Sequence, residues 1–224
     1  MRLATNFEIA CFLDGSNAMM VDDGVSLPRF MAPVKNQTIT AGRAARLTCR
    51  VENLGNYKVA WVRVDTQTIL TIHHNIITRN QRISLSHHDH KMWRLHINNV
   101  QESDRGWYMC QVNTDPMRSE RGFLEVVVPP SIIDARTSKD IVVKEGSPVN
   151  LTCEATGSPR PKIMWKREDG AMIRYNGGEL STVDGNSLAF PAASRAHVGE
   201  YLCIASNGIP PSISKRIVLR VQCN

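Results

Sequence analysis

The sequence predicts an all-β protein built of two tandem β-sandwiches. With 224 residues, the chain has room for two domains of ordinary size that each bury a core. In DRGWYMCQVNTDP, residues 104–116, side chains suited to a core occupy every second position, and a period of two is the period of a β-strand. In addition, one frame of cysteine, tryptophan and tyrosine occurs twice along the chain, which indicates a repeated module.

The repeated frame has a cysteine, a tryptophan twelve residues later, and a second cysteine with a tyrosine two positions before it. Its members are Cys49, Trp61, Tyr108 and Cys110 in the first half, and Cys153, Trp165, Tyr201 and Cys203 in the second. This frame is the signature of immunoglobulin-like sandwiches, in which a disulfide joins the two sheets and the tryptophan packs on it. It predicts the bridges Cys49–Cys110 and Cys153–Cys203, each worth about 4 kcal/mol on the chain-entropy model. Such bridges persist in oxidising compartments, so we expect an extracellular protein.

The two modules differ in length, and the difference predicts their types. The first cysteine pair encloses eleven more residues than the second, which is enough for two short additional edge strands. We therefore expect residues 29–128 to form a variable-like domain and residues 129–224 an intermediate-type domain, after an atypical or disordered leader at residues 1–28. Arg82 and Asp104 are placed to form an ion pair that closes the base of the first domain.

The stretch LEVVVPPSI connects the modules without a flexible Gly/Ser tract. Because Pro129 and Pro130 restrict the backbone, we expect a fairly stiff, extended arrangement of the two domains. The two cysteines outside the repeated frame, Cys11 and Cys223, either pair with each other or remain free thiols.

The outward side chains of the first domain are unusually apolar for a surface in water. In KVAWVRV, residues 58–64, the positions between the core residues are all apolar, and TQTILTIHHNIIT, residues 66–78, adds isoleucines that a single sheet face cannot all bury. An exposed apolar patch on a secreted domain is typical of a partner-binding surface; the alternative is that the additional strands or a loop cover it. The predicted partner-binding residues are Ala60, Val62, Val64, Ile69, Leu70, Ile72, His74, Ile76, Ile77, Met109, Gln111, Asn113 and Asp115.

Five strings extend beyond the general immunoglobulin pattern: YKVAWVRVDTQTILTIHHNIIT, GWYMCQVNTDPM, VVVPPSI, CEATGSPRPKIMWKR and GEYLCIASNGIPPSISKRI. Together they closely resemble the insect Dpr-interacting proteins, a neuronal cell-surface family related to lachesin and to the neurotrimin-like proteins. The resemblance covers roughly residues 29–222. It implies three immunoglobulin domains, heterophilic binding to Dpr proteins or homodimers in some members, and a role in matching synaptic partners. It also implies binding through the C, C′, C″ and F strands of the first domain, the surface reached independently from side-chain alternation.

Two other functions stay open at this point: homophilic adhesion of the lachesin type, and a soluble decoy or humoral protein that binds glycans. The chain stops at LRVQCN, where the resemblance implies a third domain. We expect no clean secretion signal and no membrane anchor in the chain as given, so that attachment to the plasma membrane of neurons would need a tail outside it.

Other sequence features bear on glycosylation, metal binding, nucleic-acid binding and catalysis. The sequons at Asn36 and Asn150 predict N-glycosylation. The histidines of SHHDH, residues 86–90, invite a metal interpretation with His73 and His74, but a solvated turn is the favoured interpretation and no metal or cofactor is expected. The net charge of +6 is spread along the chain, which argues against nucleic-acid binding. With no nucleophile elbow, phosphate loop or recognisable carboxylate pair, we expect no enzyme.

Overall fold

The computed structural model describes residues 26–222. Almost the whole expected leader, residues 1–28, lies outside this range, as do Cys11 and Cys223. Strands dominate the described residues, with only three short 3-10 helices between them. None of the described helices is long and apolar enough to cross a membrane.

The first domain is a sandwich of two sheets, with the strand order β1-β3-β8-β7 in one and β10-β9-β4-β5-β6 in the other, where β2 pairs in parallel with β10. A 3-10 helix, η1 (Glu102–Asp104), precedes β9. Its strands are β1 (Arg29–Ala32), β2 (Gln37–Thr40), β3 (Ala45–Glu52), β4 (Val59–Arg63), β5 (Thr68–Ile72), β6 (Asn75–Ile76), β7 (Ile83–His88), β8 (Met92–Ile97), β9 (Gly106–Val112) and β10 (Arg118–Ile132).

The second domain is smaller and follows the same plan, with a main sheet in the order β11-β20-β19-β14-β17 and the separate pairs β12-β18 and β15-β16. Two 3-10 helices, η2 (Asp134–Arg136) and η3 (Arg195–His197), belong to it. Its strands are β11 (Ile141–Lys144), β12 (Val149–Thr152), β13 (Ala155–Ser158), β14 (Lys162–Arg167), β15 (Ile173–Tyr175), β16 (Gly178–Leu180), β17 (Val183–Asp184), β18 (Ser187–Phe190), β19 (Gly199–Ser206) and β20 (Ile213–Gln222).

Each domain has its own apolar core around a disulfide and a tryptophan. Both predicted bridges, Cys49–Cys110 and Cys153–Cys203, are present. Trp61 and Trp165 are fully buried beside them, and Trp93 of β8 is a third fully buried indole, in the first core. The alternation predicted for residues 104–116 is also found, since the inner side chains of β9 are buried and the outer ones are half-buried.

The additional edge strands of the first domain are β5 and β6, and they carry one correction to the sequence analysis. Leu70, predicted to face a partner, is buried in the core. The register of β4 against β5 shifts between Trp61 and Val62, so that Val62 lies opposite Ile69 and Trp61 opposite Thr71. In such a bulge two residues oppose one, and here Leu70 and Thr71 both turn inward.

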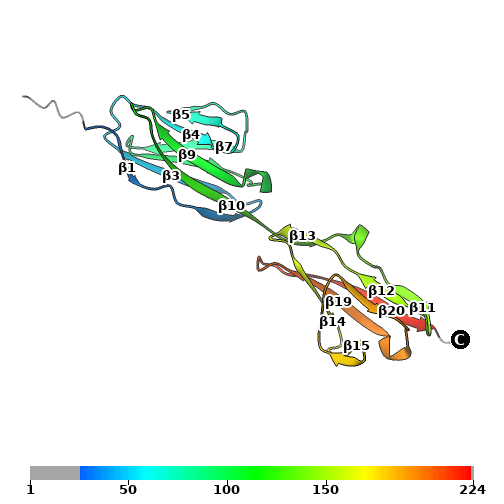
Figure 1. Cartoon of the computed structure of the whole chain (residues 1–224). Helices are drawn as coiled ribbons and strands as arrows, with labels where there is room; N and C mark the ends of the chain where they lie inside the picture. Colours follow the sequence, from blue (N-terminus) through cyan, green and yellow to red (C-terminus); the bar gives the residue numbers. More distant parts are fainter. Residues whose placement is uncertain (1–25, 223–224) are drawn as a thin grey trace, which may run out of the picture.

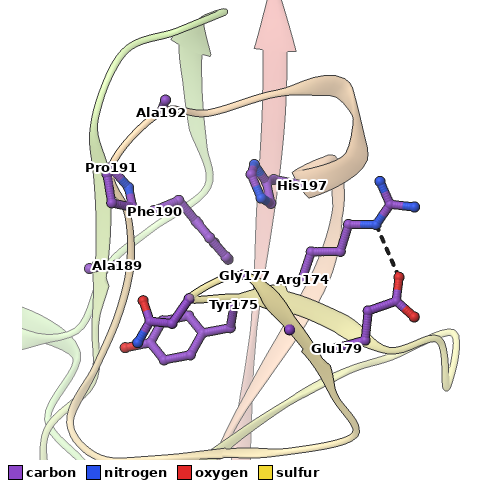
Figure 2. Close-up of a pocket in the computed structure, with 11 residues that line it drawn as sticks. Arg174, Tyr175, Gly177, Glu179, Ala189, Phe190, Pro191, Ala192 and His197 are labelled. Atoms are coloured by element: carbon purple, nitrogen blue, oxygen red, sulfur yellow. Dashed lines mark hydrogen bonds and ion pairs between the residues drawn. The ribbon is translucent and has the colours of Figure 1, made fainter.

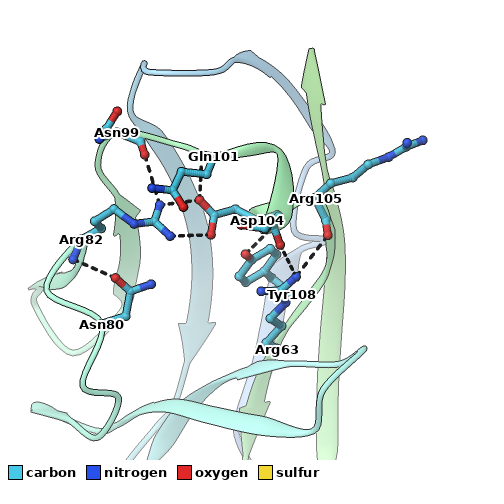
Figure 3. A network of polar contacts seen from close by, with 9 residues as sticks. Arg63, Asn80, Arg82, Asn99, Gln101, Asp104, Arg105 and Tyr108 are labelled. Carbon is cyan, nitrogen blue, oxygen red and sulfur yellow. Dashed lines mark hydrogen bonds and ion pairs between the residues drawn. The ribbon is translucent and has the colours of Figure 1, made fainter. Parts of the chain in front are cut away.

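A polar network closes the base of the first domain (Figure 3). The guanidinium of Arg82 donates two hydrogen bonds to the Asp104 carboxylate, at 2.5 and 2.8 Å. The Gln101 N–H donates to the same carboxylate at 2.8 Å, and the Tyr108 hydroxyl donates to the Asp104 carbonyl at 2.8 Å. Burial acts to raise the pKa of Asp104, but the hydrogen bonds from Arg82 and Gln101 outweigh it and hold that pKa below its ordinary value. Burial raises the pKa of Tyr108 to about 12.

The two domains share one strand. β10 begins in the first domain beside β9 and continues through Pro129 and Pro130 to pair with β13 in the second (Figure 1). The Asn207 side chain donates to the Val128 carbonyl and to the Pro159 carbonyl, each at 2.8 Å. A Cβ on Gly157 would lie 3.1 Å from the Val128 carbonyl oxygen, so a bare backbone is needed at this crossing. The connection is therefore a hydrogen-bonded strand and not a free linker.

Removing the charge of Asp104 tests the base network. Asp104→Asn should lower the free energy of unfolding of the first domain by about 3 kcal/mol, because Arg82 loses its counter-charge in a partly buried setting. Urea unfolding measures the loss. The matched control is Glu179→Gln, which breaks the exposed Arg174–Glu179 pair and should cost less than about 0.5 kcal/mol. Equal effects of the two substitutions would contradict the prediction.

The role of Asn207 in the connection is testable in solution. Asn207→Ala removes the hydrogen bond to Val128 of the crossing strand and the one to the Pro159 carbonyl in the second domain, so the distribution of inter-domain orientations should broaden. Residual dipolar couplings or X-ray scattering compare the variant with the parent chain. Asn56→Ala, at an exposed asparagine of the first domain, should leave the distribution unchanged.

Candidate functional site

The candidate site is the outer face of the sheet formed by β4, β5, β6 and β9. Strand pairing places its side chains in rows that cross the sheet. One row joins Ile69, Val62 and Met109, since Val62 lies opposite both others. The next row joins Ile72, Ala60 and Gln111 in the same way. We call the outward side chains of these two rows, together with Val64 and Ile77, the apolar face. Ile76, predicted to belong to it, lies opposite the inward Thr71 and therefore points to the other side of the sheet edge.

The apolar face is only partly covered by its own chain. The outward side chains of β4 and β9 are all half-buried, whereas their inward neighbours are buried except for Arg63 at the end of β4. Ile69 and Ile77 are more open, with about half of each side chain accessible: 45% and 50%. β5 and β6 extend the sheet at its edge and do not lie over it. Water is thus in contact with a continuous aliphatic surface.

The three polar residues of the predicted site have different surroundings. Gln111 lies within the second row and contacts the sulfur of Met117. Asn113 is exposed, but its side-chain oxygen accepts the Lys58 N–H at 2.6 Å and so ties the ends of β4 and β9 together. Asp115 is exposed beyond the end of β9. His74 is exposed in the turn between β5 and β6, at the edge of the apolar face.

An aromatic extension of the face was absent from the predicted set. Trp107 of β9 lies opposite Phe123 of β10, with ring centroids 5.1 Å apart in an edge-to-face arrangement. The guanidinium of Arg121 lies over the Trp107 ring, 4.9 Å from its centroid. The sequence gives no register between β9 and β10, so the position of Phe123 beside Trp107 is seen only in the structure.

The corresponding sheet of the second domain differs in chemistry. The outward residues of β14 are Lys162, Met164 and Lys166, and all three are exposed. Outward Leu202 and Ile204 on β19 are half-buried, so the contrast with the first domain lies mainly in β14. β14 corresponds to β4, the strand of Val62 in the first domain. Because β14 carries two lysines on its outer side, this face of the second domain is solvated.

A hollow lies in the second domain, between the β15–β16 hairpin and β18 (Figure 2). His197 takes the place that Asp104 has in the first domain: its Nδ1 accepts the Ser194 N–H at 3.0 Å, and the Tyr201 hydroxyl donates to its carbonyl at 2.8 Å. Its ring stacks on Phe190 with centroids 4.5 Å apart. Burial, and then nearby Arg174, lower the pKa of His197, so the ring is neutral and serves as a structural acceptor.

Comparison with known proteins places these observations in a family. The immunoglobulin I-set domain family matches residues 28–125, and a second immunoglobulin domain family matches residues 129–207. A solved structure of Dpr11 IG1 bound to DIP-gamma is 46% identical, covers 87% of this chain and 98% of the matched chain, and has a TM-score of 0.78. The chain belongs to the Dpr-interacting proteins of the immunoglobulin superfamily.

Other Dpr-interacting proteins and relatives agree with this assignment. A structure of Dpr2 in complex with DIP-Theta is 54% identical over 87% of this chain and 66% of the matched chain, with a TM-score of 0.72. Lachesin of Schistocerca americana is 31% identical over 81% of this chain. The chain spans about half the length of the lachesins it matches. A member of this family is a binding module and not an enzyme.

The first domain resembles a variable-type domain in its strands, but its sequence matches a different immunoglobulin family. The domain has the two additional strands β5 and β6 expected from its length, yet the family that matches it is the I-set, the intermediate type.

The neutral state of His197 gives a pH prediction. Because its pKa in the folded state lies below the unfolded value of about 6.5, its contribution to stability is present above that pH and is lost as the pH falls through the lower value. Between pH 7.5 and 5.0, His197→Asp should lose less thermal stability than the parent chain, since a carboxylate still accepts the Ser194 N–H at pH 5. Equal losses in the two proteins would contradict this role.

Proposed function

We propose that this Dpr-interacting protein is a cell-surface recognition protein that binds another immunoglobulin domain, of Dpr type, through its apolar face. The observation that carries the proposal is the continuous aliphatic surface across β4, β5, β6 and β9 of the first domain. In the second domain, the strand that corresponds to β4 carries lysines on its outer face. Two similar structures support the choice of partner, since each contains a Dpr protein together with a DIP protein.

The chemistry of the face fits a protein partner. Interface cores are depleted in charge and enriched in aromatic side chains and methionine, and the row of Ile69, Val62 and Met109 has no charged member. Val62 lies at the middle of this row, where interface residues commonly contribute most to binding. Gln111 and Trp107 lie on either side of Met109 along β9 and supply hydrogen bonding and aromatic area.

Several features support a contact at cell surfaces. Both domains hold a disulfide, which indicates an oxidising compartment. Many copies on apposed membranes add avidity, so each contact can be weak and still selective. By its family, we propose that the protein acts at the surface of neurons in matching synaptic partners.

The predicted glycosylation sites are compatible with this surface. Asn36 is exposed next to β2, at the opposite edge of the sheet from β5 and β6. Asn150 is exposed on β12 in the second domain. We propose that both carry glycans, which would leave the outer face of β4 and β5 open.

The test is a binding screen of the ectodomain against Dpr first domains and against itself, with two matched variants. Val62→Asp should weaken binding to the preferred Dpr at least about 100-fold, because it places a charge in a desolvated interface core. Its thermal midpoint should stay within a few degrees of the parent, since Val62 lies outside the core cluster.

Met164→Asp is the control, because Met164 is an outward residue of the equivalent strand in the second domain. It should leave binding unchanged. Unchanged binding in Val62→Asp would overturn the proposed face. If Val62→Asp loses only self-association, the result would assign homophilic adhesion. If binding falls with rising salt concentration and does not depend on Val62, the result would favour a glycan-binding protein that acts through its charge.

A further inference from the structure

A cluster of imidazoles lies at one edge of the first domain, where two hairpins meet. His73 and His74 form the turn between β5 and β6, His87 lies near the end of β7, and His90 is in the turn between β7 and β8. The ring centroids of His73 and His74 are 3.9 Å apart, and those of His74 and His87 are 4.3 Å apart. The sequence favoured a solvated turn over a metal site for these histidines, whereas the structure brings the two hairpins together.

Three of these rings offer nitrogen atoms to a common point. One ligand nitrogen of each of His73, His74 and His90 lies within 4.8 Å of the others. In a tetrahedral zinc site with Zn–N bonds of about 2.0–2.1 Å, neighbouring ligand atoms are about 3.4 Å apart. His74 and His90 are exposed, so small side-chain rotations can close the difference without disturbing the core.

The backbone holds two of these residues in a specific conformation. His73 and His90 both have φ of +51°, in the left-handed region that few non-glycine residues adopt. Hydrogen bonds fix both turns: the His73 N–H donates to the Val59 carbonyl at 2.6 Å, and the Lys91 N–H donates to the His88 carbonyl at 3.0 Å. The two turns thus present their imidazoles from fixed positions.

The nitrogen atoms are available to a metal. Among the described residues, Nδ1 of His73 is buried and has no hydrogen-bond partner, which is unusual for a buried polar atom. The nearby His88 differs, since its Nε2 lies 2.9 Å from the Asp89 carboxylate.

We propose that His73, His74 and His90 form a binding site for a zinc ion, with an open fourth position beside His87. Imidazole nitrogen suits Zn²⁺, whereas Mg²⁺ and Ca²⁺ require oxygen ligands. The ion would join the β5–β6 hairpin of one sheet to the β7–β8 hairpin of the other. It would therefore cross-link the two sheets at the edge of the domain, a role separate from partner binding.

The experiment is calorimetric titration of the untagged, EDTA-treated chain with zinc chloride at pH 7.5. We expect one zinc ion per chain, and a rise in the thermal midpoint when zinc is added. His74→Ala and His90→Asn should each weaken zinc binding at least 10-fold. Asparagine is chosen at position 90 because it tolerates positive φ, so that the variant folds.

His88→Ala is the matched control, since it changes a histidine of the same hairpin outside the ligand set. It should bind zinc like the parent. The proposal is overturned if the parent chain binds no zinc, or if His88→Ala weakens binding as much as His90→Asn. Circular dichroism of each variant without zinc separates loss of ligand from loss of fold, and His74→Ala provides a second, exposed position if His90→Asn is unstable.

Discussion

Much of this structure depends on the alternation of side chains in the sheet that contains β4 and β9. Trp61 and Cys110 must face inward, because the disulfide and its tryptophan form the centre of the first core. A period of two then forces Val62 and Met109 to the opposite face, whatever lies there. In a soluble domain these positions are usually polar, and here they are aliphatic. The inner face thus forms the core, and the outer face is the aliphatic surface on which the proposed function rests.

The two domains solve the same structural problem with different chemistry. Below each core a tyrosine hydroxyl donates to a backbone carbonyl four residues earlier, that of Asp104 in one domain and of His197 in the other. In the first domain a carboxylate and a guanidinium hold the base together, and the charge on Asp104 is stabilised by its partners. In the second a neutral ring accepts a backbone N–H and stacks on Phe190. The corresponding positions of the two domains therefore depend on different ionisable groups, a carboxylate in one and an imidazole in the other.

The shared strand β10 connects these domains mechanically. It pairs with β9 in the first domain and with β13 in the second, and Asn207 ties the crossing point to the loop at Pro159. Prolines at positions 129 and 130 restrict rotation within the strand itself. The apolar face of the first domain is thereby connected to the second domain through a hydrogen-bonded strand.

The sequence by itself determined the two sandwiches, both disulfides and the direction of most outward side chains. These features follow from spacing along the chain: both the frame of Cys49, Trp61 and Cys110 and the period of two can be read from residue positions alone. The aliphatic character of positions 60, 62 and 109 was predictable for the same reason. The tertiary structure alone decided the position of Leu70, because a bulge depends on how β5 aligns with β4 and breaks the simple alternation.

Tertiary structure also decided which residues of different strands become neighbours. Phe123 joins the aromatic edge only through the pairing of β10 with β9, and His90 meets His73 and His74 only because two hairpins of different sheets converge. Periodicity reports which way a side chain points from its own strand. It carries no information about register between strands or about the approach of one turn to another, and these depend on the packing of the whole domain.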